Sequence, residues 1–335
     1  MDSNRKNDHL NLALRQTIPI NHSLDRIQLI PKSMPEVNFD EIDTTTNILG
    51  HTLKAPILIA PITGGSSETE KINLSLAKVA HDLDIGMSVG SQKPMIDNFN
   101  LLYTYQVRKN APGILLFGNI GVSDLKNIET KKIENIIQNI QADSLMIHLN
   151  PMQEIFQPEG NSDFSGLLEI LREIVSNVTF PVFIRSIGCG IDPITAKRLL
   201  QVGIKGLDVA GNDGTNWISL EGNRRTEKEW QAASITFKNW GLDLYTNLKL
   251  LKNINSHTTL IGTGGISNGL QGAKVLAMGA KLFSIGRFAL DTLVNKGEDG
   301  LKSELERIIL ELKIAMFGMG IKNIFEFSHV DYYEK

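Results

Sequence analysis

The chain of 335 residues is 41% hydrophobic and 21% charged, which is ordinary for a globular protein and long enough for one large domain or two small ones. Its formal net charge of −3 gives no reason to expect nucleic acid or an anionic membrane as a partner. A single cysteine, Cys189, excludes a disulfide framework, and no apolar run approaches the roughly 20 residues of a membrane span.

The amino-terminal sequence MDSNRKNDHLNLAL is charged too densely for a secretory signal. Together with the single cysteine, it indicates a cytoplasmic protein. We expect residues 1–50 to form an N-terminal extension that folds over the active site. Because no linker rich in Pro, Gly and Ser divides the rest of the chain, we expect residues 51–335 to form one domain.

From residue 55 onward, short β-rich apolar runs alternate with segments of helical period. Such runs are typical of buried parallel strands, and they are APILIAPIT (55–63), IGMSVGS (85–91), GILLFGNIG (113–121), SLMIHLN (144–150), PVFIRSIG (181–188), GLDVAG (206–211), TLIGTGG (259–265) and LFSIGR (282–287). The predicted helices are 69–83, 132–141, 164–175, 193–202, 242–254, 269–279 and a last one at 299–316. Ser67 and Glu70 have the spacing of a capping box before the first of them.

Eight strands that alternate with helical segments predict an α/β fold of the (β/α)₈ barrel type. The alternative is a doubly wound open sheet, which is disfavoured because no GxGxxG motif follows the first strand. Active sites of such barrels form at the carboxyl ends of the strands. Here every strand ends in polar or glycine-rich residues: Thr63-Gly64-Gly65, Ser91-Gln92, Asn119, His148 with Asn150, Arg185-Ser186, Gly211 to Asn216, Gly264-Gly265 and Gly286-Arg287.

The seventh strand ends in IGTGGISNG and the eighth in FSIGR. Loops after these two strands commonly build a phosphate site in barrels, and glycines let backbone N–H groups approach phosphate oxygens closely. Arg287 would add positive charge. The alternative is that both loops are only tight turns, but the pairing of the two in strand order favours phosphate binding.

The fourth strand and the loop after it carry a cluster of acid and amide side chains. By the period of two, Met146, His148 and Asn150 share one face of the strand, so His148 and Asn150 should point into the barrel mouth. Gln153 and Glu154 follow, and the Glu154 carboxylate suits Mg²⁺, which would neutralise a diphosphate. The alternative is a core histidine and a solvated glutamate. No HExxH or CxxC motif indicates zinc.

The basic residues Arg5, Lys6 and His9 lie within five positions of one another. Such a run is usually a solvated tail. As an arm that folds over the barrel mouth, it would instead clamp an anionic substrate.

Seven motifs occur in a familiar order: RKNDHLNLAL, PITGG, VGSQ, GNIG, IHLNPMQEIFQPEG, GNDGTNW and GTGGISNG. In this order the chain resembles the type 2 isopentenyl-diphosphate delta-isomerases from about residue 5 to 320, with HLNPMQEIFQPEG the most specific block. The resemblance implies an FMN-dependent (β/α)₈ enzyme that interconverts isopentenyl and dimethylallyl diphosphate without net redox change. It also implies reduced FMN, Mg²⁺, NADPH as reductant, and a homo-oligomer, commonly a tetramer or octamer.

The resemblance further implies a role for each matching residue. Gln153 would contact the substrate and take part in proton transfer at the allylic carbon, and Glu154 would bind Mg²⁺. His148 and Asn150 would contact the diphosphate and the metal. The substrate clamp would consist of Arg5, Lys6 and His9. The FMN contacts would be Thr63, Gly64, Ser91, Asn119, Arg185, Thr215, Gly264, Gly265 and Gly286.

The fifth strand departs from the family pattern. In the family, this strand typically ends with a lysine in a V-K-E-V-G-like run. This chain instead reads FIRSIGCG, with Arg185 and Ser186. Family precedent places that cation near the N1 and C2-carbonyl edge of the flavin, where arginine would keep the charge in a planar fork. The alternative is a structural ion that lines the barrel. Cys189 is interpreted as a small packing residue rather than a nucleophile.

Two other functions remain open. The first is an FMN-linked 2-hydroxy-acid oxidase or dehydrogenase on the same barrel. Such enzymes need a histidine base beside the flavin, usually after the sixth or seventh strand, and GNDGTN and GTGGISN contain none. The second is a non-catalytic barrel that binds FMN or an isoprenoid diphosphate, which the joint presence of Gln153 and Glu154 disfavours.

Overall fold

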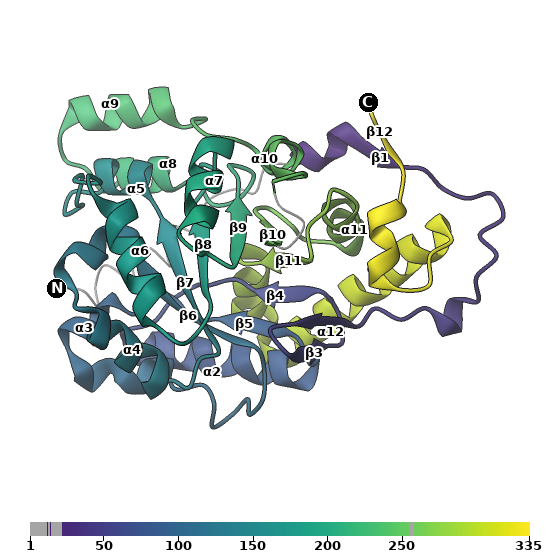
Figure 1. The fold of residues 1–335 in the computed structure, drawn as a ribbon, viewed down its shortest axis with the longest axis horizontal. Helices are drawn as coiled ribbons and strands as arrows, with labels where there is room; N and C mark the ends of the chain where they lie inside the picture. The colour runs from purple at the N-terminus through teal and green to yellow at the C-terminus, as the bar shows by residue number, and fades with distance from the viewer. Residues whose placement is uncertain (1–11, 13, 15–21, 255–257) are drawn as a thin grey trace.

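The computed structural model describes residues 12, 14, 22–254 and 258–335. Within them, eight parallel strands close into a barrel in chain order, with the last strand hydrogen-bonded to the first (Figure 1). They are β4 (Ile57–Ile59), β5 (Gly86–Ser88), β6 (Leu116–Gly121), β7 (Ser144–Leu149), β8 (Val182–Ser186), β9 (Gly206–Ala210), β10 (Thr259–Thr263) and β11 (Leu282–Ile285). The predicted (β/α)₈ barrel and its eight strands are confirmed.

Helices connect successive strands and surround the barrel (Figure 1). They are α2 (Ser67–Asp82), α3 (Lys93–Asp97), α4 (Thr130–Asn139), α5 (Pro151–Phe156), α6 (Leu167–Asn177), α7 (Pro193–Gln201), α8 (Trp217–Gly222), α9 (Lys228–Phe237), α10 (Leu244–Leu251), α11 (Gly269–Ala277) and α12 (Arg287–Met319). The 3₁₀ turns are η1 (Ser23–Arg26), η2 (Phe39–Glu41), η3 (Phe99–Tyr105), η4 (Val122–Asn127) and η5 (Ile324–His329). No helix of the described residues is long and apolar enough to span a bilayer.

Two helix starts differ from the prediction. The capping box of α2 is formed by Ser66 and Thr69, one residue before the predicted pair, because the Ser66 side chain accepts from the Thr69 backbone N–H. The last helix begins at Arg287, not at residue 299, and a non-helical Gly297 with φ 70° lies inside it. Because that glycine interrupts the helical pattern, the sequence did not predict the first turns of α12, which precede it.

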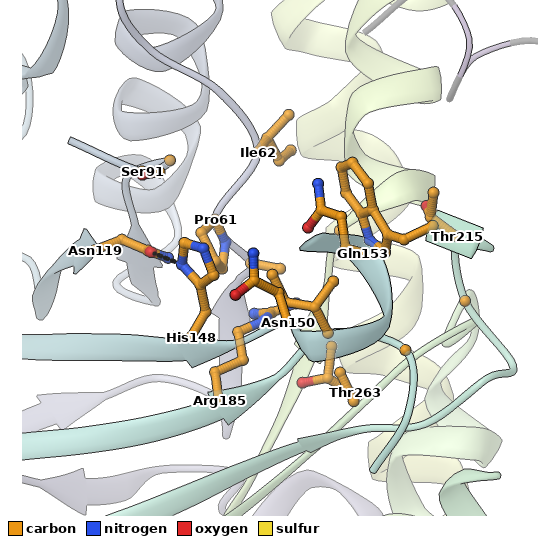
Figure 2. A pocket seen from close by; sticks show the side chains of 18 of the residues that line it. Pro61, Ile62, Ser91, Asn119, His148, Asn150, Gln153, Arg185, Thr215 and Thr263 are labelled. Carbon is orange, nitrogen blue, oxygen red and sulfur yellow. Dashed lines mark hydrogen bonds between the residues drawn. The ribbon is translucent and has the colours of Figure 1, made fainter. Parts of the chain in front are cut away.

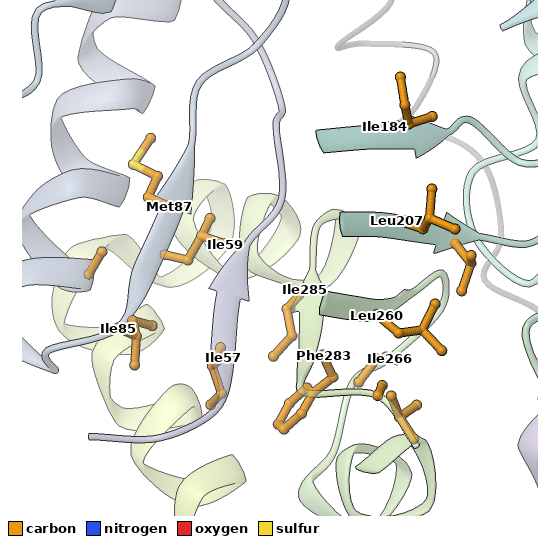
Figure 3. Packing of buried hydrophobic residues seen from close by; sticks show 14 of the residues in the cluster. Ile57, Ile59, Ile85, Met87, Ile184, Leu207, Leu260, Ile266, Phe283 and Ile285 are labelled. Atoms are coloured by element: carbon orange, nitrogen blue, oxygen red, sulfur yellow. The ribbon is translucent and has the colours of Figure 1, made fainter. Parts of the chain in front are cut away.

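The strands separate two apolar layers by their alternating side chains. Outward residues such as Ile59, Met87 and Ile285 pack against the surrounding helices in the main core (Figure 3). Inward residues, among them Phe117 and Phe183, fill the barrel itself, and these two rings meet edge to face at 5.1 Å. The barrel is thus solid below its mouth, and ligand space is left only above these side chains.

A β-hairpin closes the amino-terminal end of the barrel. It consists of β2 (Thr46–Ile48) and β3 (His51–Leu53), and both Ile48 and Leu53 belong to the interior cluster. A separate two-stranded sheet is formed by β1 (Ile27–Leu29), which pairs antiparallel with β12 (Tyr332–Glu334) and joins the two ends of the described chain. Strand β2 and the hairpin turn, which end the N-terminal extension, therefore lie at the end of the barrel opposite the mouth.

Candidate active site

A cavity of about 510 Å³ opens at the carboxyl ends of the barrel strands (Figure 2). Its volume is typical of a site for a small molecule or cofactor. The predicted site residues that line it are Thr63, Ser91, Asn119, His148, Asn150, Gln153, Glu154, Arg185, Thr215, Gly264, Gly265 and Gly286. Residues more than 200 positions apart in the sequence are thus brought into one hollow.

Among the described residues, one predicted site residue, Gly64, does not line this cavity. Gly64 lies beside it, and a Cβ atom there would be only 2.1 Å from the ring of Tyr105. The absence of a side chain at Gly64 therefore serves the packing of that tyrosine, whose hydroxyl donates to the Ser91 carbonyl at 2.8 Å. Arg5, Lys6 and His9 lie outside the described residues.

Strand β7 presents its polar face to the cavity, as the alternation predicted. Met146 lies in the barrel interior, while His148 and Asn150 line the mouth above it. His148 Nδ1 is 2.7 Å from the side-chain oxygen of Asn119 on the neighbouring strand β6. Because an amide oxygen only accepts, Nδ1 carries a proton in this contact, and Nε2 points away from Asn119.

The carboxylate of Glu154 is held in place by three hydrogen bonds. Its Oε1 accepts from Asn150 Nδ2 at 2.7 Å and from Ser123 Oγ at 3.3 Å, and its Oε2 accepts from the Asn161 backbone N–H at 2.6 Å. These three bonds fix the orientation of the Glu154 carboxylate at the cavity wall.

Gln153 is anchored by a buried acid that sequence analysis missed. Its Nε2 donates to Glu221 Oε1 at 3.0 Å, and Glu221 is fully buried at the end of α8. The other oxygen of Glu221 accepts from Arg224 at 2.6 Å, and Arg224 also pairs with Glu159 at 2.7 Å. The only signal in the sequence was a Glu and an Arg three positions apart.

Arg185 lies on the floor of the cavity in a buried ion pair. Its Nη1 donates to Asp208 Oδ2 at 2.9 Å, and Thr263 donates to the other Asp208 oxygen at 2.5 Å. Burial raises the pKa of Asp208, and the Arg185 charge opposes that shift. The ion pair fixes the Nη1 side of the Arg185 guanidinium. No described residue accepts a hydrogen bond from its Nε or Nη2, so these two nitrogen atoms are left for a ligand. Asp208 was missed, although an acid inside the apolar run GLDVAG was a signal.

The glycine-rich loops after β10 and β11 meet at one side of the cavity. Gly264 and Gly265 have φ angles of 116° and 70°, a region that favours glycine. A Cβ atom at Gly265 would lie 2.6 Å from the Asp213 carbonyl. Gly286 immediately precedes α12, whose first N–H groups have no partner within the helix. Bare backbone and a helix amino terminus together are suited to an anion.

Two described points of the N-terminal extension contact this rim. The Leu14 carbonyl accepts a hydrogen bond from Arg287 Nη2 at 2.9 Å. His22 Nε2 lies 2.9 Å from the Gly264 carbonyl, and its Nδ1 accepts from the Leu24 backbone N–H. Arg287 also pairs through Nε with both oxygens of Asp291, so its charge is already partly neutralised.

A sequence model described as FMN-dependent dehydrogenase matches residues 14–96 and 167–332. The chain belongs to this FMN-dependent family. Among curated relatives, the isopentenyl-diphosphate delta-isomerase of Rickettsia canadensis is 36% identical over 327 residues, which cover 97% of this chain and 95% of that protein. The enzyme of the same name from Rickettsia typhi is 37% identical over 322 residues, covering 95% and 94%.

Solved structures of other FMN-dependent enzymes share the fold. A mandelate oxidase with a monooxide FMN adduct aligns with a TM-score of 0.66 at 16% identity, covering 98% of this chain and 92% of that one. A lactate oxidase of Pediococcus acidilactici aligns with the same TM-score and identity, covering 98% and 86%. At this identity the likeness shows a common barrel only.

The cavity of this family member fits a bound cofactor by its own chemistry. Thr63 Oγ1 and Asn150 Oδ1 are buried at its wall and have no hydrogen-bond partner among the described residues. Buried polar atoms are nearly always satisfied, so these two indicate a ligand that supplies the missing partners. The open backbone at Gly264 and Gly265 lies on the side where a flavin phosphate would be expected.

Proposed function

We propose that this chain isomerises isopentenyl diphosphate to dimethylallyl diphosphate, and the reverse, with reduced FMN, Mg²⁺ and NADPH as the source of electrons. The observation that carries the proposal is the segment between the two matched parts of the FMN-dependent dehydrogenase model, residues 97–166. That segment contains β6, β7 and α5, which carry the acid and amide cluster of the cavity. The Rickettsia isomerases align along nearly the whole chain, this segment included.

FMN fits the side of the cavity built by the matched parts of the chain. Backbone N–H groups at Gly264, Gly265 and Gly286 would hold its phosphate, and Arg185 would lie beside the ring system. Polar contacts to the ring and its chain would come from Thr63, Ser91, Asn119 and Thr215. The reduced cofactor would supply negative charge beside the alkene, where positive charge develops as a proton is added.

The opposite wall would bind the diphosphate with Mg²⁺. Glu154 offers an ionised oxygen ligand, and His148 and Asn150 lie beside it. The described residues contain no group of three or more His, Cys, Asp or Glu able to hold a metal. Mg²⁺ usually binds one or two carboxylates together with substrate phosphates, so the diphosphate itself would complete the site.

Gln153 is the residue that we assign to proton transfer at the allylic carbon. Its amide nitrogen is held by Glu221, and no described residue donates to its amide oxygen, so the side chain is oriented while one polar atom is left for the substrate. A carboxamide does not titrate near neutral pH, so Gln153 would orient the reacting carbon and pass a proton on rather than store it.

The N-terminal arm would close the site over the bound substrate. Arg5, Lys6 and His9 would supply its positive charge. The contacts of Leu14 with Arg287 and of His22 with Gly264 support this proposal, because Arg287 and Gly264 line the cavity.

The test is turnover without an electron acceptor. Photoreduced, FMN-loaded protein with Mg²⁺ should convert isopentenyl diphosphate to dimethylallyl diphosphate under argon, over many cycles and with no consumption of reductant. Omission of Mg²⁺ should abolish conversion. Failure of the reduced, metal-loaded protein to interconvert the two diphosphates would refute the proposal.

The second candidate is an FMN-dependent 2-hydroxy-acid oxidase or dehydrogenase. It is favoured by the family match and by the fold shared with mandelate and lactate oxidases. Arg185 would pair with the carboxylate of the hydroxy acid. The only histidine among the described lining residues is His148, which comes from the fourth barrel strand and not from the loops after the sixth or seventh. Bleaching of oxidised flavin by lactate or mandelate under argon would support this function, and an unchanged flavin spectrum would exclude those substrates.

A further inference from the structure

Helix α5 is too short to be stable by itself. It has six residues, Pro151–Phe156, yet it carries both Gln153 and Glu154 into the cavity. Helices below about 12 residues are marginal in water, and the last carbonyl groups of a helix have no partner within it. Something outside α5 must therefore fix this turn.

Arg225 satisfies the carboxyl-terminal end of α5. Its Nε donates to the Phe156 carbonyl at 2.7 Å, and its Nη2 donates to the carbonyls of Gln157 at 3.0 Å and Ile155 at 3.2 Å. One guanidinium thus bonds three consecutive carbonyl groups at the negative end of the helix dipole. Only 11% of the Arg225 side chain is exposed, so solvent competes little for these bonds.

Arg225 is itself held from the α9 side. Its guanidinium carbon lies 4.6 Å from the ring centroid of Trp230, a cation–π contact. Trp230 meets Phe156 of α5 edge to face at 5.9 Å, and Gln231 donates to the Arg225 carbonyl at 2.7 Å. The arginine is therefore fixed between α5 and α9.

The neighbouring arginine acts on the other side of the same turn. Arg224 bridges Glu221, which anchors the Gln153 amide, to Glu159 just after α5. Helices α5 and α8 pack together, with α9 beyond them (Figure 1). Two consecutive arginines thus tie the catalytic turn to the segment between α8 and α9.

We propose that Arg225 is a positioning residue, whose guanidinium sets the α5 turn and so places Gln153 and Glu154 against the substrate. Arg225 does not line the cavity, so it acts only through that turn. The inference rests on the proposed isomerase function. A lysine has one ammonium group and no planar fork, so it cannot bond the three carbonyls in the same way.

The experiment compares FMN-loaded Arg225→Ala with wild type and with Arg172→Ala, a matched control whose arginine pairs with Glu169 on the surface of α6. Loss of an outer partner of a metal-binding group typically costs about 10- to 100-fold in activity or metal affinity. We expect kcat to fall, and the Mg²⁺ concentration at half-saturation to rise, by a factor in this range, with unchanged FMN affinity. Addition of guanidinium ion at millimolar concentration should restore part of kcat in R225A only.

Three results would overturn the inference: unchanged kcat and Mg²⁺ dependence in R225A, an equal loss in R172A, or a loss that guanidinium does not restore. If R225A fails to fold, Arg225→Lys serves instead, and it should keep FMN but show the same loss. If wild type does not isomerise, the proposed function fails. Arg225 is then judged by Mg²⁺-dependent binding of inorganic pyrophosphate to wild type and R225A, followed by flavin fluorescence, and equal affinities would refute it.

Discussion

At the residue scale, the cavity depends on two buried acids, Asp208 and Glu221, each paired with an arginine. Neither acid was singled out from the sequence, because sequence position alone does not say which charge has a buried partner. Candidates at the strand ends, such as His148 and Asn150, could be found because strand alternation and barrel geometry place them at the mouth.

Replacement of Asp208 with asparagine should destabilise the protein by about 3 kcal/mol, because removal of one partner leaves a buried charge uncompensated. Arg185 would then have no carboxylate, while asparagine keeps the shape and can still accept from Thr263. Urea denaturation measures the change in the free energy of unfolding. The control is Glu169→Gln, which removes one partner of an exposed ion pair on α6. It should change the free energy of unfolding little. Equal effects of the two substitutions would contradict the assignment.

Cys189 should react slowly with alkylating reagents at neutral pH. Burial raises the pKa of its thiol to about 11, so the thiolate fraction at pH 8 is about one in a thousand. The alkylation rate by iodoacetamide, followed by mass spectrometry, should rise steadily with pH toward 11. A plateau by about pH 10, as expected for a thiol with the ordinary pKa, would show that the thiol is not perturbed.

At the element scale, the phosphate loop makes a prediction about one glycine. Gly265→Ala places a methyl group 2.6 Å from the Asp213 carbonyl at a φ of 70°, so the loop must shift and FMN affinity should fall by about tenfold or more. Gly166→Ala is the matched control, because it has the same φ and open space around it. Flavin fluorescence gives both dissociation constants, and equal values would exclude the loop from cofactor binding.

The elements also show where sequence analysis succeeds. Eight strands and their main helices were predicted because buried parallel strands and amphipathic helices have distinct periods. Short helices such as α5 and α8 were not, because they depend on tertiary partners rather than on periodicity. The bonds that Arg225 makes to α5 join residues about 70 positions apart, and no local pattern reveals them.

At the scale of the whole molecule, the barrel has separate ends for stability and chemistry. The Leu53 side chain is buried in the barrel interior at the amino-terminal end. Because its truncation leaves a cavity there, Leu53→Ala should lower the free energy of unfolding by about 2–5 kcal/mol while FMN affinity is unchanged. Leu310→Ala, on an exposed part of α12, is the control and should have little effect in urea denaturation. A parallel loss of FMN affinity in the Leu53 variant would show that the two ends are coupled.

The most direct test of the isomerase function is solvent deuterium. Reduced, FMN-loaded protein with Mg²⁺ and isopentenyl diphosphate in deuterated water should give dimethylallyl diphosphate labelled in a methyl group, as NMR or mass spectrometry can show. Gln153→Ala should retain bound FMN but form labelled product about 100-fold more slowly or worse. Unlabelled substrate recovered from the wild-type protein, with FMN and Mg²⁺ both bound, would contradict proton transfer at this site.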